Sequence, residues 1–225
     1  MSVKPLRKDK KYNKYVKDFY REIEECDWNR IASHGTGLSA LFHRKRAKLT
    51  IELYRKYAKT GKVLDVGCGT GLILRTLPKG SVGVDINPRN IARCRQYAPQ
   101  AKAIEGDAES LSFPDHSFST IICTEVLEHL VFPEKATQEM YRVLQPGGIL
   151  IGSTPAACVL WRFRRFITPC SHPEPFHNEY TRAELLGLFQ NFSIEFLDRC
   201  IFSSSFFFVL SKPLRGVSKQ FSWAK

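Results

Sequence analysis

The chain has 225 residues, enough to bury a large core within one domain, and its 34 basic and 22 acidic side chains give a net charge of +12. Its seven cysteines are scattered without a Cys-x-x-Cys pair, which excludes a dense disulfide scaffold and favours reduced thiols. Neither a membrane span nor the apolar stretch of a signal peptide is apparent, so we expect a cytoplasmic protein that is at most peripheral to a membrane.

The positive charge is concentrated near the N-terminus. Residues 1–60 hold 16 basic and 7 acidic side chains. Such a surface suits an anionic partner, either RNA or a negatively charged membrane. The alternative is that the charge only keeps the protein in solution.

Residues 1–59 are expected to form a basic helical extension. From Tyr12 to Ile23, aromatic and apolar residues recur at helical spacing, and a second helix is expected over 40–58. These helices either pack on the main domain or close over a binding site. The main domain is expected at 60–212, followed by a basic tail at 213–225.

The stretch 63–71 organises the rest of the chain. Four largely apolar residues lead into glycines at 67, 69 and 71, and apolar residues then resume at helical spacing. This pattern predicts a strand, a tight turn and the start of a helix. The turn carries few side chains, so a ligand can lie against its backbone.

Strands and helices alternate through the remaining domain. We expect further strands at 81–85, 101–105, 118–124, 149–153, 192–197 and 204–210, and helices at 88–97, 133–144 and 181–190. The alternation predicts an α/β fold, a doubly wound, mostly parallel, Rossmann-like sheet of about seven strands. Residues 154–180 interrupt the pattern as a lid-like insertion before the last helix, and an insertion of this length is often functional.

Acidic residues follow the next two strands after the glycine turn. Asp85 ends the second strand, where a carboxylate can accept hydrogen bonds from both hydroxyls of a ribose. Asp107 and Ala108 follow the third strand, where an acid and a backbone amide can meet an adenine edge. The glycines run G-x-G-x-G and not G-x-G-x-x-G, which argues against a dinucleotide.

These motifs, with the Leu144–Gly148 turn, resemble the class I S-adenosylmethionine-dependent methyltransferases over about residues 60–155. The resemblance implies that Asp65 and the three glycines hold the methionine part of S-adenosylmethionine, Asp85 the ribose and Asp107 the adenine amino group. The cofactor-binding set that it implies is Asp65, Gly67, Cys68, Gly69, Gly71, Asp85, Ile86, Asp107 and Ala108.

A second group of polar residues follows the fourth strand. On a helix, Glu125, Glu128 and His129 would share one face. Together with His177, they are a candidate site for Mg²⁺ or another divalent cation. Alternatively, His129 or His177 acts as a general base without metal, or the segment only shapes the acceptor pocket. We take Glu125, His129 and His177 as the candidate catalytic residues.

The Glu-x-x-Glu-His motif is similar to that of the ubiquinone-pathway O-methyltransferases and, less closely, of small-RNA 3′-terminal 2′-O-methyltransferases. The resemblance implies O-methylation of a hydroxylated small or lipid-like acceptor. RNA methylation and a non-catalytic, cofactor-binding partner subunit are the alternatives. Contact with an anionic membrane would use the basic N-terminus, the aromatic and basic residues 161–166, and Phe206–Phe208.

Overall fold

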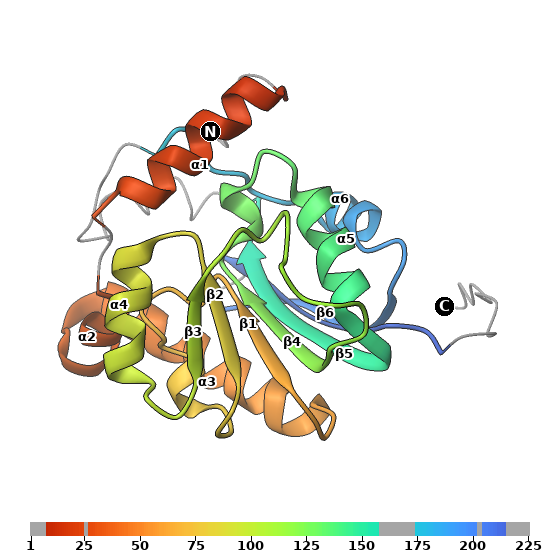
Figure 1. The fold of residues 1–225 in the computed structure, drawn as a ribbon, viewed down its shortest axis with the longest axis horizontal. Helices are drawn as coiled ribbons and strands as arrows, with labels where there is room; N and C mark the ends of the chain where they lie inside the picture. The colour runs from red at the N-terminus through yellow and green to blue at the C-terminus, as the bar shows by residue number, and fades with distance from the viewer. Residues whose placement is uncertain (1–7, 25–26, 158–173, 202–203, 215–225) are drawn as a thin grey trace.

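The computed structural model describes residues 8–24, 27–157, 174–201 and 204–214. A seven-stranded sheet forms the centre, in the order β3-β2-β1-β4-β5-β7-β6 (Figure 1). Its strands are β1 (Val63–Val66), β2 (Val82–Asp85), β3 (Lys102–Glu105), β4 (Phe118–Thr124), β5 (Leu144–Pro155), β6 (Ser193–Cys200) and β7 (Ser205–Ser211). The helices are α1 (Lys10–Glu22), α2 (Trp28–His34), α3 (Gly37–Tyr57), α4 (Pro88–Tyr97), α5 (Pro133–Val143) and α6 (Arg182–Leu188).

The sheet is parallel from β3 to β5 and antiparallel where β7 pairs with β5 and β6. The strand order reverses between β1 and β4, and ligands of open α/β sheets bind beside such a reversal, at the carboxyl ends of the strands. The expected α/β, doubly wound, mostly parallel fold is therefore confirmed.

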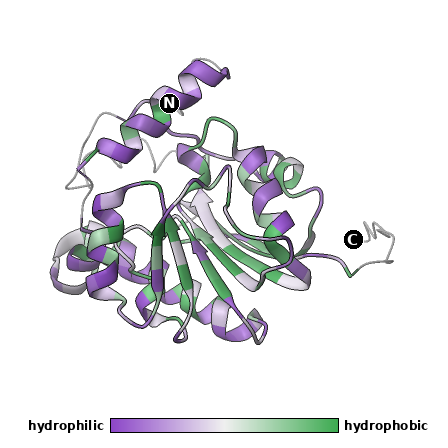
Figure 2. Ribbon diagram, in the orientation of Figure 1, coloured by the Kyte–Doolittle hydropathy of each residue, from purple (hydrophilic) through white to green (hydrophobic). Residues whose placement is uncertain are grey.

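Helices cover both faces of the sheet because neighbouring strand residues point to opposite sides. Leu64 and Ile121 pack in one cluster with Met140 of α5 and Leu185 of α6. On the other face, apolar residues of the strands pack with α2, α3 and α4. In Figure 2 the strands are mainly green between helices with purple outer surfaces, as a two-faced apolar core requires.

The N-terminal helices are part of this architecture. α3 packs on the sheet through Leu53, which lies with Ile151 and Phe207 in one apolar cluster. α1 lies apart from the helical layers, across the end of the sheet where the parallel strands finish (Figure 1). Val16 of α1 is buried there against Val131 and Phe176.

Some sequence expectations differ from the structure. The apolar residues after Gly71 form only a 3₁₀ turn, η1 (Leu74–Thr76), because Pro78 disfavours the helical conformation of the residue before it. α2 was not expected; its signal is Asp27, whose side chain accepts a hydrogen bond from the Arg30 N–H and caps the helix. α3 begins at Gly37 rather than at residue 40.

The expected membrane contact through Phe206–Phe208 is wrong. All three side chains are buried, because β7 lies between β5 and β6 and is covered on both faces. The aromatic and basic residues 161–166 and the tail after residue 214 lie outside the described residues. Among the helices that the structure describes, none has the length and apolar character needed to cross a bilayer.

Candidate functional site

The glycine turn after β1 is shaped by its backbone. Gly67, Gly69 and Gly71 have φ angles of +69°, +50° and +85°, which other residues adopt only with strain. A methyl group added to Gly67 would lie 2.2 Å from Cγ2 of Val126. Gly67 and Gly69 also line a cavity, so a ligand in it can approach the backbone closely.

Two buried carboxyls flank this turn. Asp85 accepts hydrogen bonds from the N–H groups of Gly69 (2.8 Å) and Asn87 (2.9 Å), yet burial raises its pKa. Asp65 is 2% exposed, and its Oδ2 has no hydrogen-bond partner. Burial, and then the charge of Asp85, raises the pKa of Asp65 to about 8. An unpartnered carboxylate oxygen beside a cavity is suited to a cationic group.

Asp107 is joined to α1, which the sequence reasoning did not foresee. The Lys17 ammonium lies 2.7 Å from an oxygen of Asp107 and 2.9 Å from one of Glu109. Burial opposes the charge of Lys17, but the hydrogen bonds to these two acids outweigh it and raise its pKa. Asn13 donates a further hydrogen bond to Glu109, at 2.9 Å. α1 therefore covers the predicted adenine side of the site.

The expected helical face at residues 125–129 is wrong. Only Leu127–His129 form a 3₁₀ turn, η2, and Glu125 has a left-handed backbone with φ of +56°. Glu125 accepts a hydrogen bond from Ser153 Oγ at 2.8 Å and lies 3.6 Å from the Arg46 guanidinium. Glu128 is buried and accepts from Thr154 Oγ1 at 3.3 Å. The two glutamates therefore contact different neighbours.

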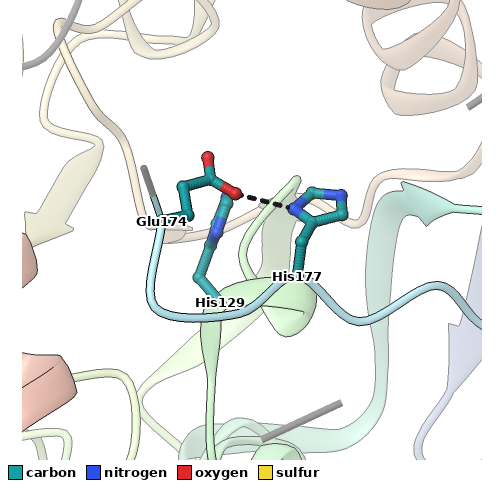
Figure 3. Close-up of side chains that lie close together, drawn as sticks. All are labelled: His129, Glu174 and His177. Atoms are coloured by element: carbon teal, nitrogen blue, oxygen red, sulfur yellow. Dashed lines mark hydrogen bonds and ion pairs between the residues drawn. The ribbon is translucent and has the colours of Figure 1, made fainter. Parts of the chain in front are cut away.

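His129 and His177 do come together (Figure 3). Their ring centroids lie 5.4 Å apart. Nδ1 of His129 makes a 2.9 Å hydrogen bond with Tyr20 OH of α1, and Nδ1 of His177 lies 3.1 Å from Oε2 of Glu174. Glu174 was absent from the expected site; its signal is its position three residues before His177.

One cavity of about 450 Å³ connects these groups, within the size range of small-molecule sites. The expected cofactor residues that line it are Asp65, Gly67, Cys68, Gly69, Asp85, Ile86, Asp107 and Ala108. Glu125, Glu128, His129 and Glu174 line its other part, with Leu38, Leu41 and Phe42 of α3. All the cofactor and reaction residues predicted from the sequence line this cavity except Gly71 and His177.

Residues 64–152 match the family model described as a methyltransferase domain. A probable S-adenosylmethionine-dependent methyltransferase of Mycolicibacterium smegmatis is 31% identical over 60% of this chain and 52% of its own length. The 2-methyl-6-phytyl-1,4-hydroquinone methyltransferase of a Synechocystis species is 41% identical over 40% of this chain and 30% of its own. The chain thus spans about half or less of the length of these two relatives.

The fold matches that of solved structures over most of the chain. The PH0226 protein of Pyrococcus horikoshii aligns with a TM-score of 0.66 and 26% identity, covering 87% of this chain and 98% of its own. The segment that matches the family model runs from β1 to β5 and contains every residue of the expected cofactor set. Residues 64–152 therefore form a methyltransferase domain that is similar in sequence to an S-adenosylmethionine-dependent methyltransferase.

Proposed function

We propose that this protein transfers the methyl group of S-adenosylmethionine to a hydroxylated, lipid-like small molecule. The observation that carries the proposal is the shared cavity. It joins the glycine turn and the acids after β1, β2 and β3 to Glu125, His129 and an apolar wall from α3. Donor and acceptor can therefore meet in one cavity.

The residues of the first half of the cavity fit S-adenosylmethionine. Oδ2 of Asp65 is buried and has no partner, so it suits the amino group of the methionine part. The space beside Gly67 and Gly69 suits its backbone, Asp85 the ribose hydroxyls and Asp107 the adenine amino group. When bound, the cofactor supplies an electrophilic methyl group on a sulfonium sulfur.

The residues of the second half would position and activate the acceptor. His129 is the candidate general base, since its ring lines the cavity and Tyr20 fixes its orientation. Glu125, held between Arg46 and Ser153, would orient the acceptor hydroxyl. Alignment of the reacting atoms alone would lower the activation free energy of methyl transfer by on the order of several kcal/mol.

Apolar side chains favour a lipid-like acceptor over RNA. Leu38, Leu41 and Phe42 line the cavity, and Leu38 is 65% exposed at its edge. An exposed leucine at a cavity edge can guide an apolar tail inward. The hydroquinone methyltransferase among the relatives is named for a ring that carries such a tail, which supports the same class of acceptor.

The expected cytoplasmic location and membrane contact stay proposals. The four described cysteines, Cys68, Cys94, Cys123 and Cys200, form no disulfide, which supports a reducing compartment. With Phe206–Phe208 buried, contact with an anionic membrane would instead use the exposed leucines of α3 and the basic residues beside them.

The test is a transfer assay with methyl-labelled S-adenosylmethionine against prenylated hydroquinones, catechols, a lipid extract and short RNAs. We expect label in the hydroquinones or the lipid extract, on oxygen by mass spectrometry of the product. His129→Gln should lower turnover, while the exposed His34→Gln serves as the matched control. Label only in RNA, or on carbon, would contradict the proposed acceptor chemistry.

A further inference from the structure

We propose that His129, Glu174 and His177 bind a divalent transition-metal ion. One ligand atom of each residue lies within 4.8 Å of those of the other two. Figure 3 shows the three side chains converging, His129 from η2 and the other two from the last part of the 154–180 insertion, just before α6. The inference rests on the proposed function only for the role of the ion, because its binding needs neither cofactor nor acceptor.

The ligand set differs from the one expected from the sequence. Glu174 is the carboxylate of the cluster. Glu125 is instead turned toward Arg46 and Ser153, and Glu128 accepts a hydrogen bond from Thr154. Two imidazoles and one carboxylate favour Zn²⁺, Mn²⁺, Fe²⁺ or Co²⁺, whereas Mg²⁺ prefers oxygen ligands. Three protein ligands also leave coordination positions open for an acceptor.

The surroundings of the cluster support binding of a cation. If Nδ1 of His129 donates to Tyr20 OH, the lone pair lies on Nε2, as a metal ligand requires; this hydrogen bond is 2.9 Å long. The buried carboxylate of Glu128 lies 3.9 Å from that Nε2 and adds negative charge close to the site. Tyr20 and Glu128 are therefore positioning residues for the ion.

The site lies where an ion can act on an acceptor. His129 and Glu174 line the same cavity as the glycine turn. With the ion bound, His129 would be a ligand and not the general base; the ion would instead lower the pKa of a coordinated hydroxyl and stabilise the developing oxyanion.

The direct test is titration of the full-length protein, without a polyhistidine tag, with Co²⁺ followed by visible absorption, and with Zn²⁺ by calorimetry. We expect one ion per chain. His177→Gln and Glu174→Gln should each weaken binding by more than about 100-fold, and Tyr20→Phe by roughly tenfold. His34→Gln and the exposed Glu195→Gln are the matched controls, and circular dichroism shows whether each variant is folded.

The inference is overturned if the wild type binds no Co²⁺ or Zn²⁺ stoichiometrically, or if folded His177→Gln and Glu174→Gln variants bind as it does. Its failure is distinguishable from that of the proposed function. Methyl transfer without metal binding contradicts only the metal site, and metal binding without methyl transfer to any acceptor contradicts only the function.

Discussion

Asp65→Asn tests the electrostatics of the cofactor site. Burial and Asp85 raise the pKa of Asp65 from 3.8 to about 8. The folded protein therefore keeps a proton that the unfolded chain loses above pH 4, and stability falls as pH rises between about 4 and 8. The slope is about 1.4 kcal/mol per pH unit, so the cost at pH 7 is at most about 4 kcal/mol. Asparagine ionises in neither the folded nor the unfolded state, so Asp65→Asn removes this pH-dependent loss of stability.

Thermal unfolding of the ligand-free proteins from pH 5 to pH 8 measures the effect. The melting temperature of Asp65→Asn should exceed that of the wild type by an amount that grows with pH, reaching on the order of 10 °C at pH 8. A difference that is constant over this range would refute the reasoning. The exposed Asp198→Asn, on β6, is the matched control.

The same substitution should weaken cofactor binding, although it stabilises the ligand-free protein. A cationic amino group beside Asp65 favours its charged form, so binding near pH 7 should release protons, detected by calorimetry in two buffers of different ionisation enthalpy. Asp65→Asn should bind S-adenosylmethionine at least about tenfold more weakly, because it lacks the charge. If Asp65→Asn binds S-adenosylmethionine with the affinity and proton release of the wild type, the cofactor's amino group does not lie beside Asp65.

Gly67→Ala should destabilise the protein by about 2 kcal/mol or more in urea unfolding and abolish cofactor binding, because its φ is +69° and the methyl would contact Val126. Tyr20→Phe should lower kcat more than the KM for the acceptor, measured by steady-state kinetics, since Tyr20 orients His129. Thr181→Ala should cost about 1 kcal/mol in urea unfolding by removing the capping box of α6, with cofactor affinity unchanged.

Much of the fold could be predicted because it is specified locally. Apolar runs followed by glycine or acidic residues mark the strands, and Asn87-Pro88 and Thr181 mark helix starts through their caps. The run Phe206–Phe208 was misread because a strand buried on both faces has the same composition as an exposed apolar patch. Only its place between β5 and β6 distinguishes the two.

Most of the predicted cofactor residues line one cavity because they follow consecutive strands of a parallel sheet, whose order is readable from the sequence. The contacts of the reaction half were not foreseen, since they join distant parts of the chain. Tyr20 contacts a histidine 109 residues later, and Lys17 contacts an acid 92 residues later. Glu125 does not lie on the expected helical face, because its backbone adopts a left-handed conformation. No periodicity in the sequence indicates such a conformation.

The central claim is that the cavity beside the glycine turn binds S-adenosylmethionine through Asp85. Equilibrium binding of S-adenosylmethionine to the wild type, Asp85→Asn and the control Asp198→Asn tests it most directly. We predict one site per chain in the wild type and the control, and a loss of at least about tenfold in affinity for Asp85→Asn. Equal affinity in all three, or no binding to the wild type, would contradict the account.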